Sequence, residues 1–223
     1  MLGSNLGISD LRQIAVLNRL CDDYGIDTIS AGNVIGFLME SYEKKFVKER
    51  VEWGDYQRAR TILEDIVHRR GLGNSLAEGV KRFGEKIGRE SLSWSMNVKG
   101  LEVSAFNCHS TPGMALAYAT SPIGAHHKDG WIITWEVKLG KDNYDVNKVE
   151  KVIESQRIRG GIFEILTVCR FPYGEMHFEL EWYLKFLRAA TGAELSLDHM
   201  FLVADRIYSL LRAFWVREYG NSW

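Results

Sequence analysis

The sequence has little cysteine and little proline, and neither sign of charge predominates. Its three cysteines, Cys21, Cys108 and Cys169, follow no paired spacing. This argues against a disulfide framework and favours a reducing compartment, the cytoplasm. Only three prolines occur, which fits a helix-rich chain because proline is expelled from helix interiors. The 28 basic and 29 acidic residues give a net charge of −1 and no electrostatic footprint for nucleic acid or an anionic membrane.

Long apolar runs, repeats and low-complexity segments are also absent. No stretch reaches the roughly 18 apolar residues of a membrane span. The first ten residues have neither a basic start nor an apolar run, which argues against a secretory signal. What is present is a globular composition, 46% hydrophobic and 12% aromatic over 223 residues, sufficient for one large or two small domains.

Apolar residues recur at helical spacing along most of the chain, so we predict a mainly α fold. We expect N-caps at Ser9, at Asp27 or Thr28, at Asp55 and at Ser196, and a capping box from Ser75 to Glu78. The segment 197–219 has the widest apolar stripe and is predicted to be a central core helix. The predicted helices cover residues 10–24, 28–42, 55–70, 76–87, 113–121, 146–168, 175–190 and 197–219.

The only convincing strand-like text lies within residues 98–103. We therefore predict two packed helical subdomains, 1–96 and 97–223, with one short extended or β segment near residues 98–105. In the long helix 146–168, the pair Gly160-Gly161 is expected to introduce a kink.

An acidic helix–helix corner organises the first subdomain. Residues 22–27 read Asp-Asp-Tyr-Gly-Ile-Asp, and Gly25 is expected to end the first helix in the left-handed conformation. Asp22 and Asp23 fall in the last helical turn, where the macrodipole disfavours anions by roughly 0.3–1 kcal/mol each. With Asp27, these acids form either a solvated corner or a carboxylate clamp for a ligand rich in N–H donors.

Two further features carry chemistry in the second subdomain. His126 and His127 lie beside a glycine turn, and adjacent side chains of an extended segment point to opposite sides, so one buried and one exposed histidine is the structural expectation. The alternative is a metal site, for which zinc at His126, His127 and Cys108 is one hypothesis. Cys169 follows a helix, where a lone cysteine is usually a small hydrophobic residue.

The first corner resembles a motif of the tungsten-dependent aldehyde ferredoxin oxidoreductases. Asp22-x-x-Gly25-Ile26-Asp27 is similar to their Asp-x-x-Gly-Leu-(Asp/Cys) motif, whose acids hydrogen-bond a pterin. The neighbouring segments 2–11 and 27–30 also resemble the family. The resemblance implies that Asp22, Gly25, Ile26 and Asp27 bind a pterin.

Two other segments resemble the same family. Residues 119–127 are similar to its active-site pattern Ala-Thr-x-x-x-Gly-(Gly/Ala)-x-His, which implies that His127 is catalytic and donates a hydrogen bond or proton to the substrate oxygen. Ile123 stands where many members have an arginine facing the cofactor. In residues 101–109 the initial Leu-Glu is kept, whereas the family's proline, aspartate and arginine are not.

Residues 164–169 resemble the family's second motif, Asp-x-x-Gly-Leu-Cys, with departures. Glu164, Thr167 and Val168 replace Asp, Gly and Leu, while Cys169 is retained. The resemblance implies that Glu164 and Val168 contact the second pterin and that Cys169 is one of four thiolates on a [4Fe–4S] cluster. A β-branched threonine is expected to be strained at a position that requires positive φ.

The resemblance therefore implies an oxidoreductase fragment. It would be the C-terminal portion of a tungsten or molybdenum bis-pterin enzyme that oxidises small aldehydes to carboxylic acids, with electron transfer through the cluster to ferredoxin. The other three cluster ligands and a β-rich domain are expected outside this chain, in an N-terminal half that is a separate chain or a missing segment, and the chain alone should be inactive. The alternative function is a non-catalytic helical interaction or remnant module derived from that fold.

Overall fold

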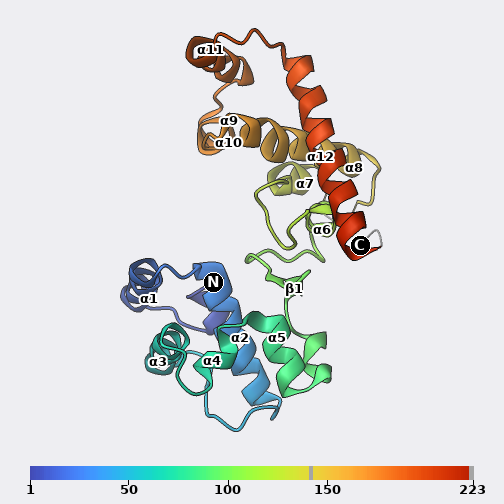
Figure 1. Ribbon diagram of the computed structural model, residues 1–223. Helices are drawn as coiled ribbons and strands as arrows, with labels where there is room; N and C mark the ends of the chain where they lie inside the picture. Colours follow the sequence, from blue (N-terminus) through green and yellow to red (C-terminus); the bar gives the residue numbers. More distant parts are fainter. Residues whose placement is uncertain (141–142, 221–223) are drawn as a thin grey trace. The chain divides into compact units, whose positions relative to one another are not determined.

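The computed structural model describes residues 1–140 and 143–220, and most of them are helical (Figure 1). This confirms the predicted mainly α class. The chain divides into two compact units. The first unit contains Met1–Phe106 together with Ile123–Ala125, and the second contains Asn107–Pro122 and the chain from His126 onward.

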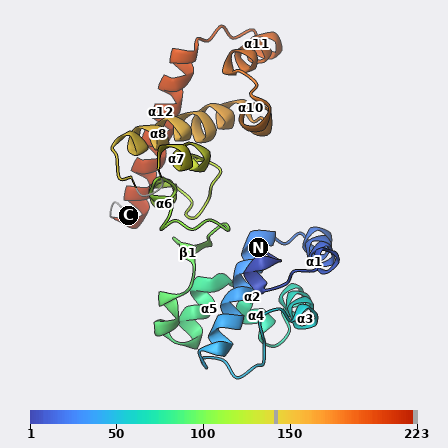
Figure 2. The ribbon, with the colours of Figure 1, turned by 180° about the vertical axis from the view of Figure 1, so that it is seen from behind.

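The first unit is built around α2 (Thr28–Glu43), which is buried from Ala31 through Met39 and packs against α1, α3 and α5 (Figures 1 and 2). Its apolar core joins Leu17, Ile35, Leu63 and Phe83 from these four helices. The unit's other elements are η1 (Ser4–Leu6), α1 (Leu11–Tyr24), α3 (Tyr56–Val67), α4 (Gly73–Leu76), α5 (Gly79–Ile87), η2 (Arg89–Ser93), β1 (Asn97–Val98) and β2 (Leu101–Glu102).

Helix starts follow the sequence signals in part. Asp27 caps α2 by accepting a hydrogen bond from the backbone N–H of Ser30 at 2.7 Å, and Asp55 caps α3 in the same way. Ser9 was wrongly predicted as the cap of α1, because Asp10 accepts the bond from the backbone N–H of Arg12.

The predicted capping box is also wrong. Ser75 lies inside α4, and the Glu78 carboxylate is held by Arg69 at 2.5 Å and by Arg82 at 3.1 Å. The two arginines bind this carboxylate, which the sequence pattern had predicted to cap the helix terminus.

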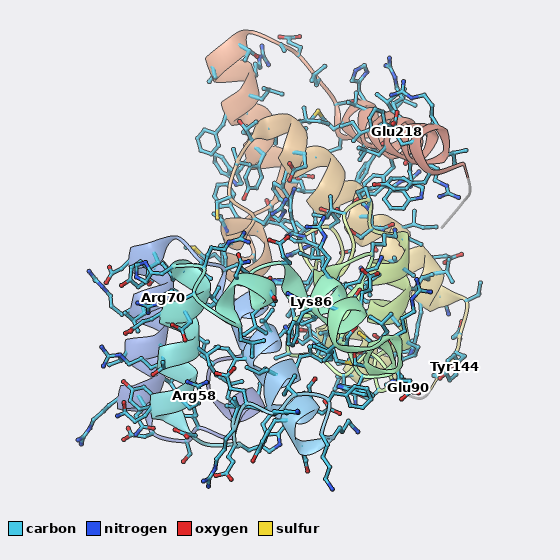
Figure 3. The ribbon with its side chains drawn as sticks, turned by 60° about the horizontal axis from the view of Figure 1, so that its bottom comes forward. Arg58, Arg70, Lys86, Glu90, Tyr144 and Glu218 are labelled. Atoms are coloured by element: carbon cyan, nitrogen blue, oxygen red, sulfur yellow. The ribbon has the colours of Figure 1, made fainter. Side chains whose placement is uncertain are left out.

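Charged side chains cover the outside of the first unit. Figure 3 shows Arg58 and Arg70, from α3 and the turn that follows it, at this surface. Arg70 pairs with Asp65 at 3.0 Å, and Arg58 pairs with Glu49. Exposed pairs of this kind contribute about 0–1 kcal/mol each, so the unit is stabilised mainly by its apolar core.

The predicted extended segment is a short antiparallel hairpin in which Asn97 lies opposite Glu102. It belongs to the first unit, whereas the sequence placed residues 97–106 in the second subdomain. Ile123–Ala125 joins it, with the backbone N–H of Ala125 donating to the Val98 carbonyl at 3.3 Å. A methyl group on Gly124 would lie 2.3 Å from that oxygen, and the residue has φ +111°, so this contact requires glycine.

The second unit consists of helices and connecting loops in its described residues (Figure 2). The predicted helix 146–168 is one helical run, but its middle third is a π-helical turn that contains Gly160 and Gly161. A methyl group on Gly161 would lie 2.3 Å from the Ala204 Cβ, so the glycines let α12 approach closely. The elements are α6 (Pro112–Thr120), α7 (Ile133–Leu139), α8 (Asn147–Gln156), η3 (Arg157–Ile162, the π turn), α9 (Phe163–Leu166), α10 (Phe171–Met176), α11 (Leu180–Thr191) and α12 (Leu197–Tyr219).

A buried ion pair ties three of these helices together. Glu136 on α7 is fully buried, and its Oε1 accepts from the Lys148 Nζ of α8 at 2.9 Å. The same oxygen accepts from the backbone N–H of Gly113 in α6 at 2.7 Å. The carboxylate therefore fixes α6, α7 and α8 at one point.

Two predictions about the C-terminal helices were wrong. The predicted helix 175–190 is interrupted because His177 adopts φ +54° and ends α10, so α11 begins only at Leu180. Helix α12 starts at the predicted Ser196 cap, yet it is not central, since Met200 and Ala204 are its buried residues. Large apolar side chains exposed on α12 are Leu202, Leu210, Leu211, Phe214, Val216 and Tyr219.

Across residues 1–140 and 143–220, no helix has both the length and the apolar character needed to cross a bilayer.

Candidate functional site

The acidic corner between α1 and α2 is a tight helix end. Gly25 has φ +66°, and its N–H donates to the Asp22 carbonyl at 3.2 Å, while the N–H of Ile26 donates to the Cys21 carbonyl at 2.8 Å. This pattern ends the helix as expected of a left-handed glycine. The Asp22 and Asp27 carboxylates are exposed and Ile26 is half-buried.

Both carboxylates retain room for ligand donors. Asp22 Oδ2 accepts from the Asn18 side chain at 3.2 Å, and Asp27 Oδ2 accepts from the N–H of Ser30 at 2.7 Å. An ionised carboxylate has about four acceptor sites. Burial is the main cause that raises the pKa of the Cys21 thiol to about 11, and the charges of Asp22 and Asp27 add to this shift. The corner therefore suits a ligand that presents N–H donors.

The second motif has the same backbone arrangement. Thr167 has φ +52°, its N–H donates to the Glu164 carbonyl at 3.3 Å, and the N–H of Val168 donates to the Phe163 carbonyl at 3.4 Å. The expected positive φ at the position of the family's glycine is confirmed. Both six-residue motifs thus end a helix in the same way, although their sequences differ.

The carboxylate of the second motif has a different environment. Glu164 Oε1 lies 2.6 Å from the Lys128 Nζ and also pairs with Arg170. Lys128 directly follows His127, and Arg170 directly follows Cys169. Glu164 therefore links the loop that carries His127 to the segment that carries Cys169.

A cavity of about 550 Å³ in the second unit brings His127 and Cys169 together. Cys169 is exposed and both histidines are half-buried, so the expectation of one buried and one exposed histidine was wrong. The His126 and His127 rings stack at 5.9 Å between centroids, and the N–H of Lys128 donates to His126 Nδ1 at 3.0 Å. The cavity is lined by His126, His127, Lys128, Trp131, Arg159, Cys169, Arg170, Phe171 and Gly174.

The lining contains three cations that the sequence reasoning did not single out. Lys128, Arg159 and Arg170 outnumber the two carboxylates that pair with them, Glu164 and Asp129, so the cavity keeps an excess of positive charge. His127 contacts Trp131 edge to face at 5.5 Å. The available signal was the basic residue immediately after each of His127 and Cys169. A cavity of this size and charge fits an anionic group of small-molecule dimensions.

The zinc hypothesis is not supported. In the described part of the chain, no group of three His, Cys, Asp or Glu side chains is placed to hold a metal ion. Cys108 is half-buried and its pKa is raised by burial, which disfavours the thiolate that zinc requires.

Comparison with known proteins assigns the family. Residues 1–222 match the family described as aldehyde ferredoxin oxidoreductase, domains 2 & 3, and the chain belongs to this family. It is 33% identical, over 226 aligned positions, to the tungsten-containing aldehyde ferredoxin oxidoreductase of Thermococcus kodakarensis. The alignment covers 96% of this chain and 36% of that protein, and the Pyrococcus furiosus enzyme of the same name gives the same figures.

Two further matches have lower coverage or lower sequence identity. The WOR-like subunit of an aliphatic sulfonate oxidoreductase from Pyrococcus furiosus is 33% identical over 137 residues, 56% of this chain and 22% of that one. The active-site complex BamBC of benzoyl coenzyme A reductase, solved with 1,5-dienoyl-CoA, is similar in structure with a TM-score of 0.67 and 22% identity. That match covers 96% of this chain and 40% of the other, and it shows a shared fold. The chain thus spans about a third of the length of the aldehyde ferredoxin oxidoreductases it matches.

Proposed function

We propose that this chain is the C-terminal portion of a tungsten or molybdenum bis-pterin oxidoreductase that converts small aldehydes to carboxylic acids in the cytoplasm. The observation that carries the proposal is the basic cavity of the second unit, which His127 and Cys169 both line. Membership of the family supports it. Activity would require the N-terminal half, as a separate chain or a missing segment, and ferredoxin as the electron acceptor.

The first corner would hold one pterin. Asp22 and Asp27 would accept hydrogen bonds from its N–H groups, each charge-assisted bond contributing about 1.5–3 kcal/mol. Gly25 forms the backbone turn between the two acids, which stand at the first and last positions of the six-residue motif, and Ile26 would supply apolar contact beside them. The exposure of both carboxylates is consistent with this role.

The second corner would hold the other pterin more weakly. Glu164 and Val168 occupy the matching positions, but Glu164 Oε1 already binds Lys128 and Arg170. These contacts reduce the acceptor capacity left for a ligand. The two cations outnumber this carboxylate, so a positive charge remains beside the cavity, which suits the phosphate groups of an anionic cofactor.

Cys169 would supply one thiolate to a [4Fe–4S] cluster, whose other three ligands would come from outside this chain. Its exposure is compatible with ligation from a neighbouring segment. When bound, the metal–pterin and the cluster would supply the redox chemistry for the conversion of aldehyde and water to carboxylic acid, two protons and two electrons, with the electrons leaving to ferredoxin.

His127 would act on the substrate directly. A half-buried imidazole at the cavity wall can donate a hydrogen bond or a proton to the aldehyde oxygen. Its edge-to-face contact with Trp131 restrains the ring, and Glu164 restrains the loop through Lys128. This chain therefore binds and orients the substrate, while electron transfer depends on groups it shares with the rest of the enzyme.

One alternative is a non-catalytic helical module derived from the same fold. The strained Thr167 and the paired Glu164 favour it, because both weaken the second motif as a pterin site. The two functions differ in one outcome: a module would not need Asp22 or Cys169 for metal binding in an assembled complex.

The deciding experiment is metal analysis of this chain co-purified with an N-terminal partner. We expect tungsten or molybdenum together with iron, loss of the pterin metal in Asp22→Asn, and loss of iron in Cys169→Ser. Matched controls are Asp23→Asn, whose exposed carboxylate pairs with Arg19, and Cys108→Ser. A complex that lacks both metals, or in which Asp22→Asn and Cys169→Ser retain them, refutes the proposal.

A further inference from the structure

A second cavity of about 700 Å³ lies beside the His127 cavity in the same unit. Trp131, Arg159 and Gly174 line both cavities, so they form a common wall. The proposed function assigns nothing to this space, which we call the side cavity. Its volume lies within the range of about 300–1,000 Å³ that is typical of small-molecule sites.

The side cavity has aromatic walls. Trp131 and Trp135 come from α7 and the loop before it, Tyr173 from α10, and Phe178 from the segment between α10 and α11. All four are half-buried, so each presents part of a ring to the cavity. The backbone N–H of Trp131 donates to the Ser155 hydroxyl at 3.0 Å, which fixes that wall to α8. Aromatic walls favour a flat ligand that stacks on them.

The charged residues around the cavity favour an anion. Lys138, Lys151 and Arg159 line it, and Lys151 is paired with Glu154 at 2.6 Å. Arg159 is oriented by its Nε, which donates to the Lys128 carbonyl at 3.1 Å. The second acid, Glu179, is exposed. Lys138 is exposed as well, so the three cations and the two carboxylates of the lining leave a net charge of +1 beside the aromatic walls.

The common wall places the side cavity next to the catalytic candidate. Trp131 contacts the His127 ring edge to face at 5.5 Å on the side of the first cavity. A ligand that stacks on Trp131 would therefore lie one ring away from His127. The side cavity is a suitable place for the part of a molecule that does not react.

We propose that the side cavity binds a planar aromatic anion, with the ring held between Trp131, Trp135 and Phe178 and the negative charge toward Lys138 and Arg159. Binding of this anion needs only residues of this chain. Its relevance to substrate choice rests on the proposed function, in which case the enzyme prefers substrates that carry an aromatic, negatively charged group.

The test is a titration of the ¹⁵N-labelled chain with 2-naphthoate, followed by the indole N–H resonances of its seven tryptophans. We expect saturable shifts at Trp131 and Trp135 and none at Trp53, which lies in the first unit. The neutral analogue 2-naphthylmethanol, which has the same ring system, is expected to bind about fivefold more weakly because it lacks the charge.

Variants locate the site. Trp135→Leu is expected to weaken 2-naphthoate about tenfold because it removes a stacking surface. Lys138→Gln is expected to weaken it about threefold, while the exposed Lys48→Gln control has no effect. Trp135→Phe keeps a smaller aromatic ring, so it is expected to weaken 2-naphthoate less than the leucine variant does, and it provides the readout if the leucine variant does not fold.

Three outcomes would overturn the inference: equal affinity for the neutral analogue, shifts that include Trp53, or unchanged binding in both Trp135 variants. The measurement uses the metal-free chain, so it is independent of the metal analysis. Failure of the naphthoate titration leaves the redox proposal intact, and loss of metal in Cys169→Ser leaves the side cavity untouched.

Discussion

At the scale of the residue, Thr167 shows how a motif can keep its backbone after losing its glycine. It adopts φ +52° and ψ +37°, a conformation that costs a non-glycine residue roughly 1–2 kcal/mol. Gly25 occupies the corresponding position of the first motif without that cost. The surrounding helical segment holds Thr167 in this conformation. The fold therefore accepts threonine in place of the family's glycine at a cost in stability.

We predict that Thr167→Gly stabilises the chain by up to about 1 kcal/mol, because relief of the left-handed strain exceeds the extra entropy of an unfolded glycine. Urea unfolding measures the change. Thr61→Gly in the exposed face of α3 is the matched control, and it should destabilise by a few tenths of a kcal/mol because its backbone is helical. A destabilised Thr167→Gly would contradict the interpretation.

Single residues were predictable where a local rule decides them. The sequence identified the Gly25 helix end, the Asp55 cap and the positive φ at Thr167, and it narrowed the cap of α2 to Asp27 or Thr28. It missed the pairing of Glu164 with Lys128, because the two residues are brought together by tertiary folding and no local pattern records it. The cations of the His127 cavity were missed although Lys128 and Arg170 directly follow His127 and Cys169, because adjacency in sequence does not show which side chains line a cavity.

At the scale of the element, the Glu136–Lys148 pair determines how α6, α7 and α8 meet. Both side chains are almost completely buried, at 0% and 4% residue exposure. Desolvation makes such a pair a weak source of net stability, yet loss of one partner leaves an uncompensated charge in the interior. The pair therefore specifies the packing of the three helices.

Lys148→Met should destabilise the second unit by about 3–5 kcal/mol, since Glu136 would remain buried without its cation. The double variant Glu136→Gln/Lys148→Met should recover more than half of that loss, because the neutral amide can still accept from Gly113. Lys151→Met, which breaks an exposed pair on the same helix, should change stability by about 0.5 kcal/mol or less. Denaturant midpoints of the three variants give the comparison, and equal losses in the single and double variants would contradict it.

Most of the long helices were predictable from periodicity, but the existence of α7, the helix ends and the packing partners were not. The break at His177 requires a non-glycine residue at φ +54°, which no sequence rule signals. The π turn contains Gly160 and Gly161, whose lack of side chains lets α12 approach closely, a contact between segments far apart in sequence. Apolar periodicity likewise indicated a core role for α12 because it records which face is apolar, not whether that face is covered.

At the scale of the whole molecule, the uncovered side of α12 is the largest departure from expectation. Leu210 is 71% exposed and Phe214 is 54% exposed. The same helix ends near Glu218, labelled in Figure 3. Apolar side chains gathered on one exposed helix favour association in water, so the isolated chain should self-associate as its concentration rises.

The double variant Leu210→Glu/Phe214→Glu should lower that association, because it places two charges on the apolar side of α12. Sedimentation velocity over a concentration series provides the measurement. Leu11→Glu is the control, since Leu11 is 79% exposed on the first unit, and it should leave the association unchanged. An equal response of the two variants would show that general charge, and not α12, governs the behaviour.

The segment Ile123–Ala125 determines how the chain can be divided. It is bonded to β1 of the first unit, although the residues on either side of it belong to the second. If the chain were cut after Phe106, Gly124 would no longer lie against Val98. The β1 edge of the hairpin would then lose its hydrogen bond from the backbone N–H of Ala125. To express the two units as independent proteins, residues 123–125 would have to be joined to the first unit by a new linker. A simple truncation would leave the first unit incomplete, and the second would carry a segment before His127 that has lost its partner strand.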